Sequence, residues 1–226
     1  MEVPQDDDTR LTEAVAYYHS LLDNEALAQA SVEALQKGQR AKRLTFGDRP
    51  LSVSLRPQLL SRRRYEHAIA AAQSIYKALQ ALEKALLRDP ELRAELDLDP
   101  AEQRLALADR GCRSSSPSAR LDSFFAQQVR YVEYNAESPA GMAYGDNIAE
   151  VFAALPVMRA FRKRYRGRFP VTRHRQLATM LRAFKQWGRE PEPVIAIVDW
   201  VGLPTATEFE MFKEYVHPRQ PTARGE

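Results

Sequence analysis

Cysteine and histidine are scarce in this chain. Its 226 residues include one cysteine, Cys112, and four histidines. A single cysteine cannot form a disulfide within the chain, and low cysteine usage is typical of proteins from reducing compartments. No Cys-x-x-Cys or His-Glu-x-x-His spacing occurs, so the sequence excludes the common zinc sites built from these residues.

Long apolar runs and a strong net charge are also missing. No stretch approaches the ~20 consecutive apolar residues of a transmembrane helix. The acidic start, MEVPQDDD, lacks the apolar core of a secretory signal, so we predict a cytoplasmic protein that does not enter a membrane. The formal net charge is only +3, so charge alone names no partner.

The composition is that of a folded globular protein. Hydrophobic residues make up 44% of the chain and charged residues 28%, which is enough apolar material for a sizeable core. In the first half, apolar residues recur at helical spacing between Asp, Asn and Gly residues that favour helix ends. The predicted elements are helices at 9–22, 24–38 and 60–88, two short helices within 88–111, and a hairpin over 44–55 around a Gly-Asp turn.

The second half mixes strand and helix patterns. The predicted elements are strands at 121–125 and 129–134, a helix at 147–166 bent at Pro156, a helix at 172–187, a buried parallel strand at 193–200 (PVIAIVDW), and a helix after Thr205. These patterns predict a mixed α/β (α+β) fold. We expect three segments: a helical N-terminal region with a small hairpin (1–118), a second hairpin with its following helices (119–190), and a strand–helix unit with a tail (191–226).

Polar side chains gather at one end of the second predicted hairpin. If Gln127-Gln128 forms its tip, Asp122 lies opposite Glu133 and Arg120 lies opposite Asn135. Alternate residues of a strand share a face, so all four side chains would project together. Carboxylate and amide oxygens are ligands that Mg²⁺ accepts alongside phosphate and water, and a neighbouring arginine can bind a phosphate oxygen.

Two other interpretations of this hairpin stay open. Arg120 could simply neutralise Asp122 and Glu133 on a solvent-facing side of the hairpin. Gln-Gln is also a poor two-residue turn, and a one-residue slip in register would separate the four side chains.

Two motifs carry a resemblance to a known family. Arg120 and Asp122 belong to an R-x-D segment, EYNAESPAG follows at 133–141, and IAIVDWVGLPTATEF follows at 195–209. Over about residues 120–215 the chain resembles the circularly permuted ATP-grasp proteins of the glutathionylspermidine-synthase-like kind. The helical N-terminal part is compatible with this resemblance.

The resemblance implies an activity and assigns roles to the matching residues. Proteins of this family use ATP and Mg²⁺ to join a carboxylate to an amine or a thiol through an acyl phosphate. The matching positions imply Asp122, Glu133 and Asn135 as Mg²⁺ ligands, and Arg120 as a catalytic arginine near the transferred phosphate. Further candidates for substrate binding are Glu137 and Ser138, which follow the implied metal ligands within EYNAESPAG, and Asp199, at the end of the predicted buried strand.

The sequence also departs from this family. In the family, the lysines that grip ATP lie further along the chain, and we find neither a glycine-rich phosphate loop nor a clear lysine-bearing strand here. We therefore expect an incomplete ATP-grasp arrangement that begins a pre-ATP-grasp strand–helix unit. As the N-terminal part of such a ligase, the chain would be inactive alone and would need the C-terminal half as a partner.

Arginines crowd the stretch between residues 159 and 189. The interpretation that we favour is a pair of ordinary helices, in which Phe161 and Tyr165 pack inward and the arginines stay solvated. The stretch could instead meet ATP or another anionic substrate, or, least favoured, bind nucleic acid. The alternative to the ligase is therefore a non-enzymatic interaction module with an arginine-rich surface.

Overall fold

The computed structural model describes residues 5–108, 116–126, 128–137, 139–188 and 193–217. Helices dominate these residues, and two antiparallel sheets of two strands each complete them. The prediction of a mixed fold with helices and small antiparallel strands is therefore confirmed. None of the described helices is long and apolar enough to cross a membrane. Cys112 and Ser138 lie outside the described residues.

Helices α1 (Gln5–Leu22) and α2 (Glu25–Ala41) form the N-terminal pair. The Asn24 side chain caps α2 as predicted, because it accepts a hydrogen bond from the backbone N–H of Leu27 at 3.0 Å.

The predicted end of α2 at Gly38 is wrong, since the helix continues to Ala41. Close packing against a neighbouring helix explains why a glycine occupies position 38. A Cβ on Gly38 would lie 2.7 Å from Cγ1 of Val151 on α6 (Met142–Ala154). The missing side chain therefore lets α2 and α6 approach closely.

The first hairpin is shorter than predicted. Its strands β1 (Thr45–Phe46) and β2 (Arg49–Pro50) have two residues each, and residues 51–55 form no strand. This stretch packs on the core instead, and the carbonyl of Leu55 accepts a hydrogen bond from the Tyr18 hydroxyl at 2.8 Å. Burial raises the pKa of Tyr18 to about 12.

Helix α3 (Arg62–Arg88) is a long helix whose arginine-rich first turn has structural contacts. Arg64 forms an ion pair with Asp8 at 3.3 Å and donates a hydrogen bond to the carbonyl of Ala126 at 2.7 Å. The turn therefore connects α1, α3 and the tip of the second hairpin. The two predicted short helices follow as α4 (Pro90–Ala94) and α5 (Pro100–Leu107).

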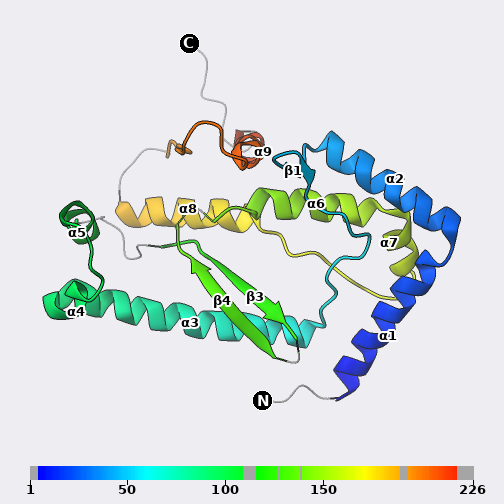
Figure 1. Ribbon diagram of the computed structural model, residues 1–226, viewed down its shortest axis with the longest axis horizontal. Helices are drawn as coiled ribbons and strands as arrows, with labels where there is room; N and C mark the ends of the chain where they lie inside the picture. The colour runs from blue at the N-terminus through cyan, green and yellow to red at the C-terminus, as the bar shows by residue number, and fades with distance from the viewer. Residues whose placement is uncertain (1–4, 109–115, 127, 138, 189–192, 218–226) are drawn as a thin grey trace, which may run out of the picture.

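The second hairpin consists of β3 (Arg120–Phe125) and β4 (Val129–Asn135), and it lies beside α3 (Figure 1). The hydroxyl of Tyr131 donates a hydrogen bond to the carbonyl of Ala68 on α3. Together with the contact from Arg64, this bond attaches the hairpin to one side of the helix.

The core surrounds α6, which packs against α2, α7 (Pro156–Phe161), α8 (Arg173–Trp187) and α9 (Ala206–Val216). The helix predicted at 147–166 is thus two helices, and the break falls at Pro156, where the sequence predicted a bend. The side chains that are most completely buried come from several elements: Tyr18, Leu44, Leu155, Val157 and Ser31. The core contains residues from each of the three segments that the sequence distinguishes.

The predicted buried strand at 193–200 is wrong. This stretch has no strand partner among the described residues, and its side chains are largely exposed, with Val194 at 95% and Trp200 at 85%. A strand needs neighbours to satisfy its backbone groups. The two hairpins pair only within themselves, so the apolar run has no sheet to enter.

Candidate functional site

The candidate site is the end of the second hairpin where the chain enters β3 and leaves β4. Arg120 pairs with Asn135, and Asp122 pairs with Glu133, in the register that the sequence predicted. The alternation of side chains then brings the four polar groups to the same region of the hairpin.

A β-bulge separates the predicted register at Asp122 and Glu133 from a shifted register toward the tip of the hairpin. Beyond Asp122 the pairing shifts by one residue, so that Ser123 lies opposite Tyr131 and Val132 is the extra residue. The pairing then ends at Phe125 and Val129, which leaves three residues at the tip instead of the two that were predicted. The slip therefore does occur, but the bulge confines it to the tip side of the site.

Arg120 holds Asp122 directly. Its Nε donates to Oδ1 of Asp122 at 2.7 Å, and its Nη1 donates to the carbonyl of Ala140 at 2.8 Å. These contacts connect the strand to the loop that follows β4. The hydrogen bond from Arg120 lowers the pKa of Asp122, and the charge of Arg120 and the Glu133 side chain lower it further.

Glu133 has a different partner. The amide Nδ2 of Asn135 donates to Oε1 of Glu133 at 2.8 Å. Arg120 is therefore paired with Asp122 alone, and no ion pair to Glu133 exists among the described residues. The alternative interpretation, in which Arg120 neutralises both carboxylates, is therefore met for Asp122 and not for Glu133.

The donor set suits a hard divalent cation. Two carboxylates and one amide oxygen are the kind of ligands that Mg²⁺ takes, with the remaining positions filled by water or phosphate. Within the described residues, no group of three or more His, Cys, Asp or Glu side chains could hold a metal. A metal at the hairpin would thus need the Asn135 amide as well as Asp122 and Glu133. The side chain of Asp122 is 43% exposed, so an ion can reach it from solvent.

The other predicted contacts are less well placed. Glu137 is exposed in the bend after β4. Ser138 lies outside the described residues. Asp199 is exposed, does not follow a strand, and accepts a hydrogen bond from the backbone N–H of Trp200 at 2.8 Å. In Figure 1 its segment, just before α9, and the hairpin lie on opposite sides of α8. The structure therefore brings Arg120, Asp122, Glu133 and Asn135 together but not Asp199.

A buried carboxylate from α9 binds the start of α6, the helix that follows the hairpin in the chain. Glu208 accepts hydrogen bonds from the backbone N–H groups of Gly141, Ala143 and Tyr144 at distances of 2.7–3.1 Å. Gly141, at the N-cap, has a positive φ of 109° and no side chain with which to cap the helix. Glu208 therefore replaces the missing cap and joins the IAIVDWVGLPTATEF stretch to the EYNAESPAG stretch.

Comparison with protein-family models, curated proteins and solved structures found no match to this chain.

A second polar centre lies between α6 and α8. Asp146 accepts hydrogen bonds from the backbone N–H and the hydroxyl of Thr172, both at 2.7 Å, and from the backbone and side chain of Arg173. Burial alone would raise the pKa of Asp146, but these hydrogen bonds outweigh it and leave the pKa below its usual value. Arg173 also pairs with Glu150, which in turn pairs with Lys42, at 2.6 Å each.

The roles of Glu208 and Asp146 were not predicted from the sequence, although the residues around each of them carry a signal. Glu208 precedes Met211 and Phe212 by three and four residues, so it occupies the apolar stripe of its own helix. Asp146 likewise lies among buried residues of α6. An acidic residue on an apolar helix face predicts a buried partner, because a buried charge must be compensated.

Proposed function

We propose that the end of the second hairpin binds Mg²⁺ together with the phosphates of ATP. In this proposal the chain carries the metal-binding part of an ATP-grasp ligase, which joins a carboxylate to an amine or thiol through an acyl phosphate. The observation that carries the proposal is the pairing of Asp122 with Glu133 and of Arg120 with Asn135.

Each side chain has a distinct role in the proposed site. Asp122 and Glu133 would bind the cation through carboxylate oxygens, and Asn135 would rotate its amide oxygen toward it. Bound Mg²⁺ would neutralise phosphate charge. Arg120 would exchange its bond to Asp122 for a phosphate oxygen and would stabilise the charge of the transferred group.

The surroundings support a positioned Arg120. Its bond to the Ala140 carbonyl leads directly to Gly141, whose N–H is held by buried Glu208. Ala140 and Gly141 are thus held from two sides, by a strand residue and by a helix residue. A guanidinium that is oriented in advance loses less freedom when it binds phosphate.

The rival nucleic-acid module receives less support. Phe161 is buried and stacks on Tyr165, with ring centroids 5.2 Å apart, and Arg164 lies over the ring of Tyr17 at 4.8 Å. These rings are engaged with the core and with arginines of the chain itself. They therefore do not form the open stacking platform that single-stranded nucleic acid requires.

Calorimetric titration with ATP, with and without Mg²⁺, tests the proposal. We expect binding that requires Mg²⁺ and that Asp122→Asn weakens about tenfold or more, because one of two charged ligands is lost. Asp23→Asn, an exposed residue in the α1–α2 turn, removes the same charge and should bind normally. The proposal is contradicted if ATP shows no binding component that requires Mg²⁺, or if Asp122→Asn and Asp23→Asn have equal affinity for that component.

A further inference from the structure

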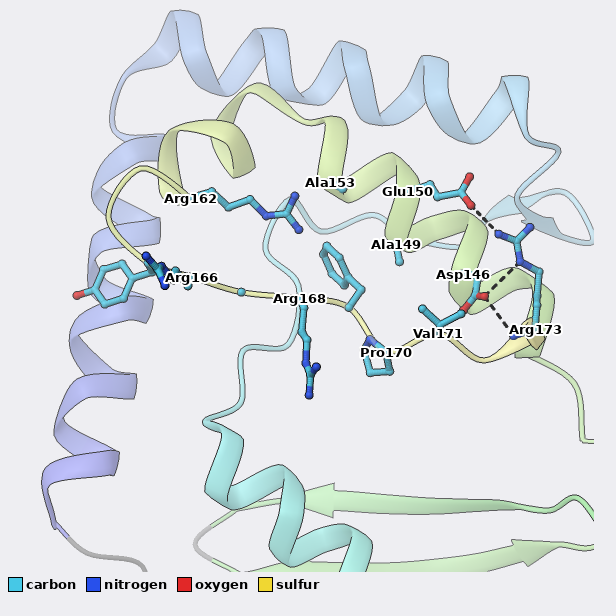
Figure 2. Close-up of a pocket in the computed structure, with 13 residues that line it drawn as sticks. Asp146, Ala149, Glu150, Ala153, Arg162, Arg166, Arg168, Pro170, Val171 and Arg173 are labelled. Carbon is cyan, nitrogen blue, oxygen red and sulfur yellow. Dashed lines mark hydrogen bonds and ion pairs between the residues drawn. The ribbon is translucent and has the colours of Figure 1, made fainter. Parts of the chain in front are cut away.

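A hollow, separate from the hairpin, lies between α6 and the segment 162–173 (Figure 2). Its volume is about 680 Å³, within the roughly 300–1,000 Å³ range of small-molecule sites. The wall from α6 is a single helix face, with residues spaced by three and four positions: Asp146, Ala149, Glu150 and Ala153. Because Ala149 and Ala153 have short side chains, they leave room in front of this wall.

The opposite wall is rich in arginine. Arg162, Arg166, Arg168 and Arg173 all line the hollow, against only two carboxylates. Both carboxylates already have partners, since Arg173 binds Asp146 and Glu150, and Lys42 binds Glu150 as well. In the part of the chain that the structure describes, no ion pair engages the remaining three arginines. The hollow therefore has a neutralised end and a positively charged end.

The arginines approach the hollow from different positions. In Figure 2 the guanidinium of Arg162 extends from α7 toward Ala153 and Ala149, whereas Arg168 points from the extended segment toward α3. The guanidinium carbon of Arg162 lies 5.7 Å from the ring centroid of Phe169, which packs against the core. One of the cations thus lies over an aromatic ring that packs against the core.

We propose that this hollow binds a small polyanion that carries adjacent phosphate groups, such as a diphosphate. Guanidinium groups donate paired hydrogen bonds in a planar fork that matches phosphate oxygens. Several neighbouring cations without counter-charges repel one another, and a multiply charged anion relieves that repulsion. The site needs no metal, and it does not depend on the function proposed for the hairpin.

A small ligand suits this geometry better than a nucleic acid does. The three unpaired arginines line one concavity instead of following an extended stripe. Arg164, which lies between Arg162 and Arg166 in the sequence, does not line the hollow. Its guanidinium carbon lies 4.8 Å from the ring centroid of Tyr17 and 5.5 Å from that of Tyr165. Arg162 therefore extends into the hollow, and Arg166 and Arg168 add positive charge around it.

Calorimetric titration with inorganic pyrophosphate, without divalent cations and at low ionic strength, tests the proposal. We expect the double variant Arg162→Gln/Arg166→Gln to bind at least about tenfold more weakly, since charged hydrogen bonds are lost. Arg166→Gln/Arg168→Gln, which leaves the contact of Arg162 with Phe169 intact, should do the same. The matched control is Arg159→Gln/Lys163→Gln, which removes two exposed charges nearby that do not line the hollow and should bind normally.

The outcomes separate this site from the hairpin. Asp122→Asn should bind pyrophosphate with unchanged affinity, whatever it does to Mg²⁺-ATP. The proposal is overturned if pyrophosphate does not bind, if orthophosphate binds equally well, or if the control loses as much affinity as the arginine variants. Tight binding of single-stranded RNA that pyrophosphate cannot displace would identify a nucleic-acid surface and would also overturn it.

Discussion

The backbone N–H of Gly141 lies 2.7 Å from Oε2 and 2.9 Å from Oε1 of Glu208, a residue 67 positions away in the chain. The same carboxylate accepts hydrogen bonds from Ala143 and Tyr144. It therefore compensates the first turn of α6, where a helix exposes unpaired donors and the positive end of its dipole. The loop between β4 and α6 depends on this contact for its position.

Glu208→Ala should destabilise the fold by about 2–3 kcal/mol, because it leaves buried backbone donors without an acceptor. Glu208→Gln keeps one acceptor oxygen and should cost about 1 kcal/mol. Urea denaturation measures both values. Glu210→Ala on the same helix is the control, since its 3.6 Å ion pair with Lys213 is exposed and should contribute under about 1 kcal/mol. Equal losses at both positions would refute the capping role.

Asp146 should make stability depend on pH. Its pKa in the folded protein lies below the usual value of 3.8, so the folded state binds this proton less tightly than the unfolded chain does. The contribution is fully present above the usual value and is lost as the pH falls through the folded-state pKa. Asp146→Asn should therefore cost about 2–3 kcal/mol at neutral pH and progressively less in acid.

Urea denaturation of wild type and Asp146→Asn across pH 2–7 measures this difference. Glu214→Gln removes an exposed carboxylate that pairs with Arg43, and its effect should stay small throughout. A constant gap between wild type and Asp146→Asn at all pH values would mean that Asp146 acts through packing alone.

Mg²⁺ should raise the melting temperature if the hairpin binds it. At ten times the dissociation constant the gain is about 1.4 kcal/mol, or a few degrees for a chain of this size. Glu133→Gln should abolish the rise. Because Arg120 is paired with Asp122 and not with Glu133, this variant should stay within about 0.5 kcal/mol of wild type without metal. Melting temperatures of wild type and Glu133→Gln that do not change with Mg²⁺ would indicate that the hairpin end is a solvated polar face with no metal site.

Gly38 should not tolerate a larger side chain. Gly38→Ala adds about 1 kcal/mol of helix propensity, but its Cβ would press against the buried Val151 at 2.7 Å, and overpacking typically costs about 1–3 kcal/mol. We expect a net loss in thermal or urea stability. Val151→Ala should cost less in the Gly38→Ala background than in wild type, because it removes the clash. Strictly additive effects would show that the two helices do not meet there.

The sequence by itself determined the local elements. Alternation of residue types predicted the second hairpin and the pairing of Asp122 with Glu133, because the period-2 pattern restricts which residues can share a face. Asn24 and Pro156 marked helix boundaries through backbone chemistry that acts within a few residues. These effects act over a few residues, so they can be predicted from the order of residues along the chain.

Only the tertiary structure decided which elements meet. The hairpin lies against α3, where the Tyr131 hydroxyl donates a hydrogen bond to the carbonyl of Ala68, 63 positions earlier in the chain. Glu208 accepts hydrogen bonds at the start of α6, 67 positions away, and Asp146 does so at the start of α8, 26 positions away. No local sequence pattern predicts contacts between residues so far apart in the chain. The apolar run at 193–200 has the composition of a buried strand, yet it is largely exposed because no described strand pairs with it. A strand is completed by its neighbours, whereas a helix satisfies its own backbone hydrogen bonds.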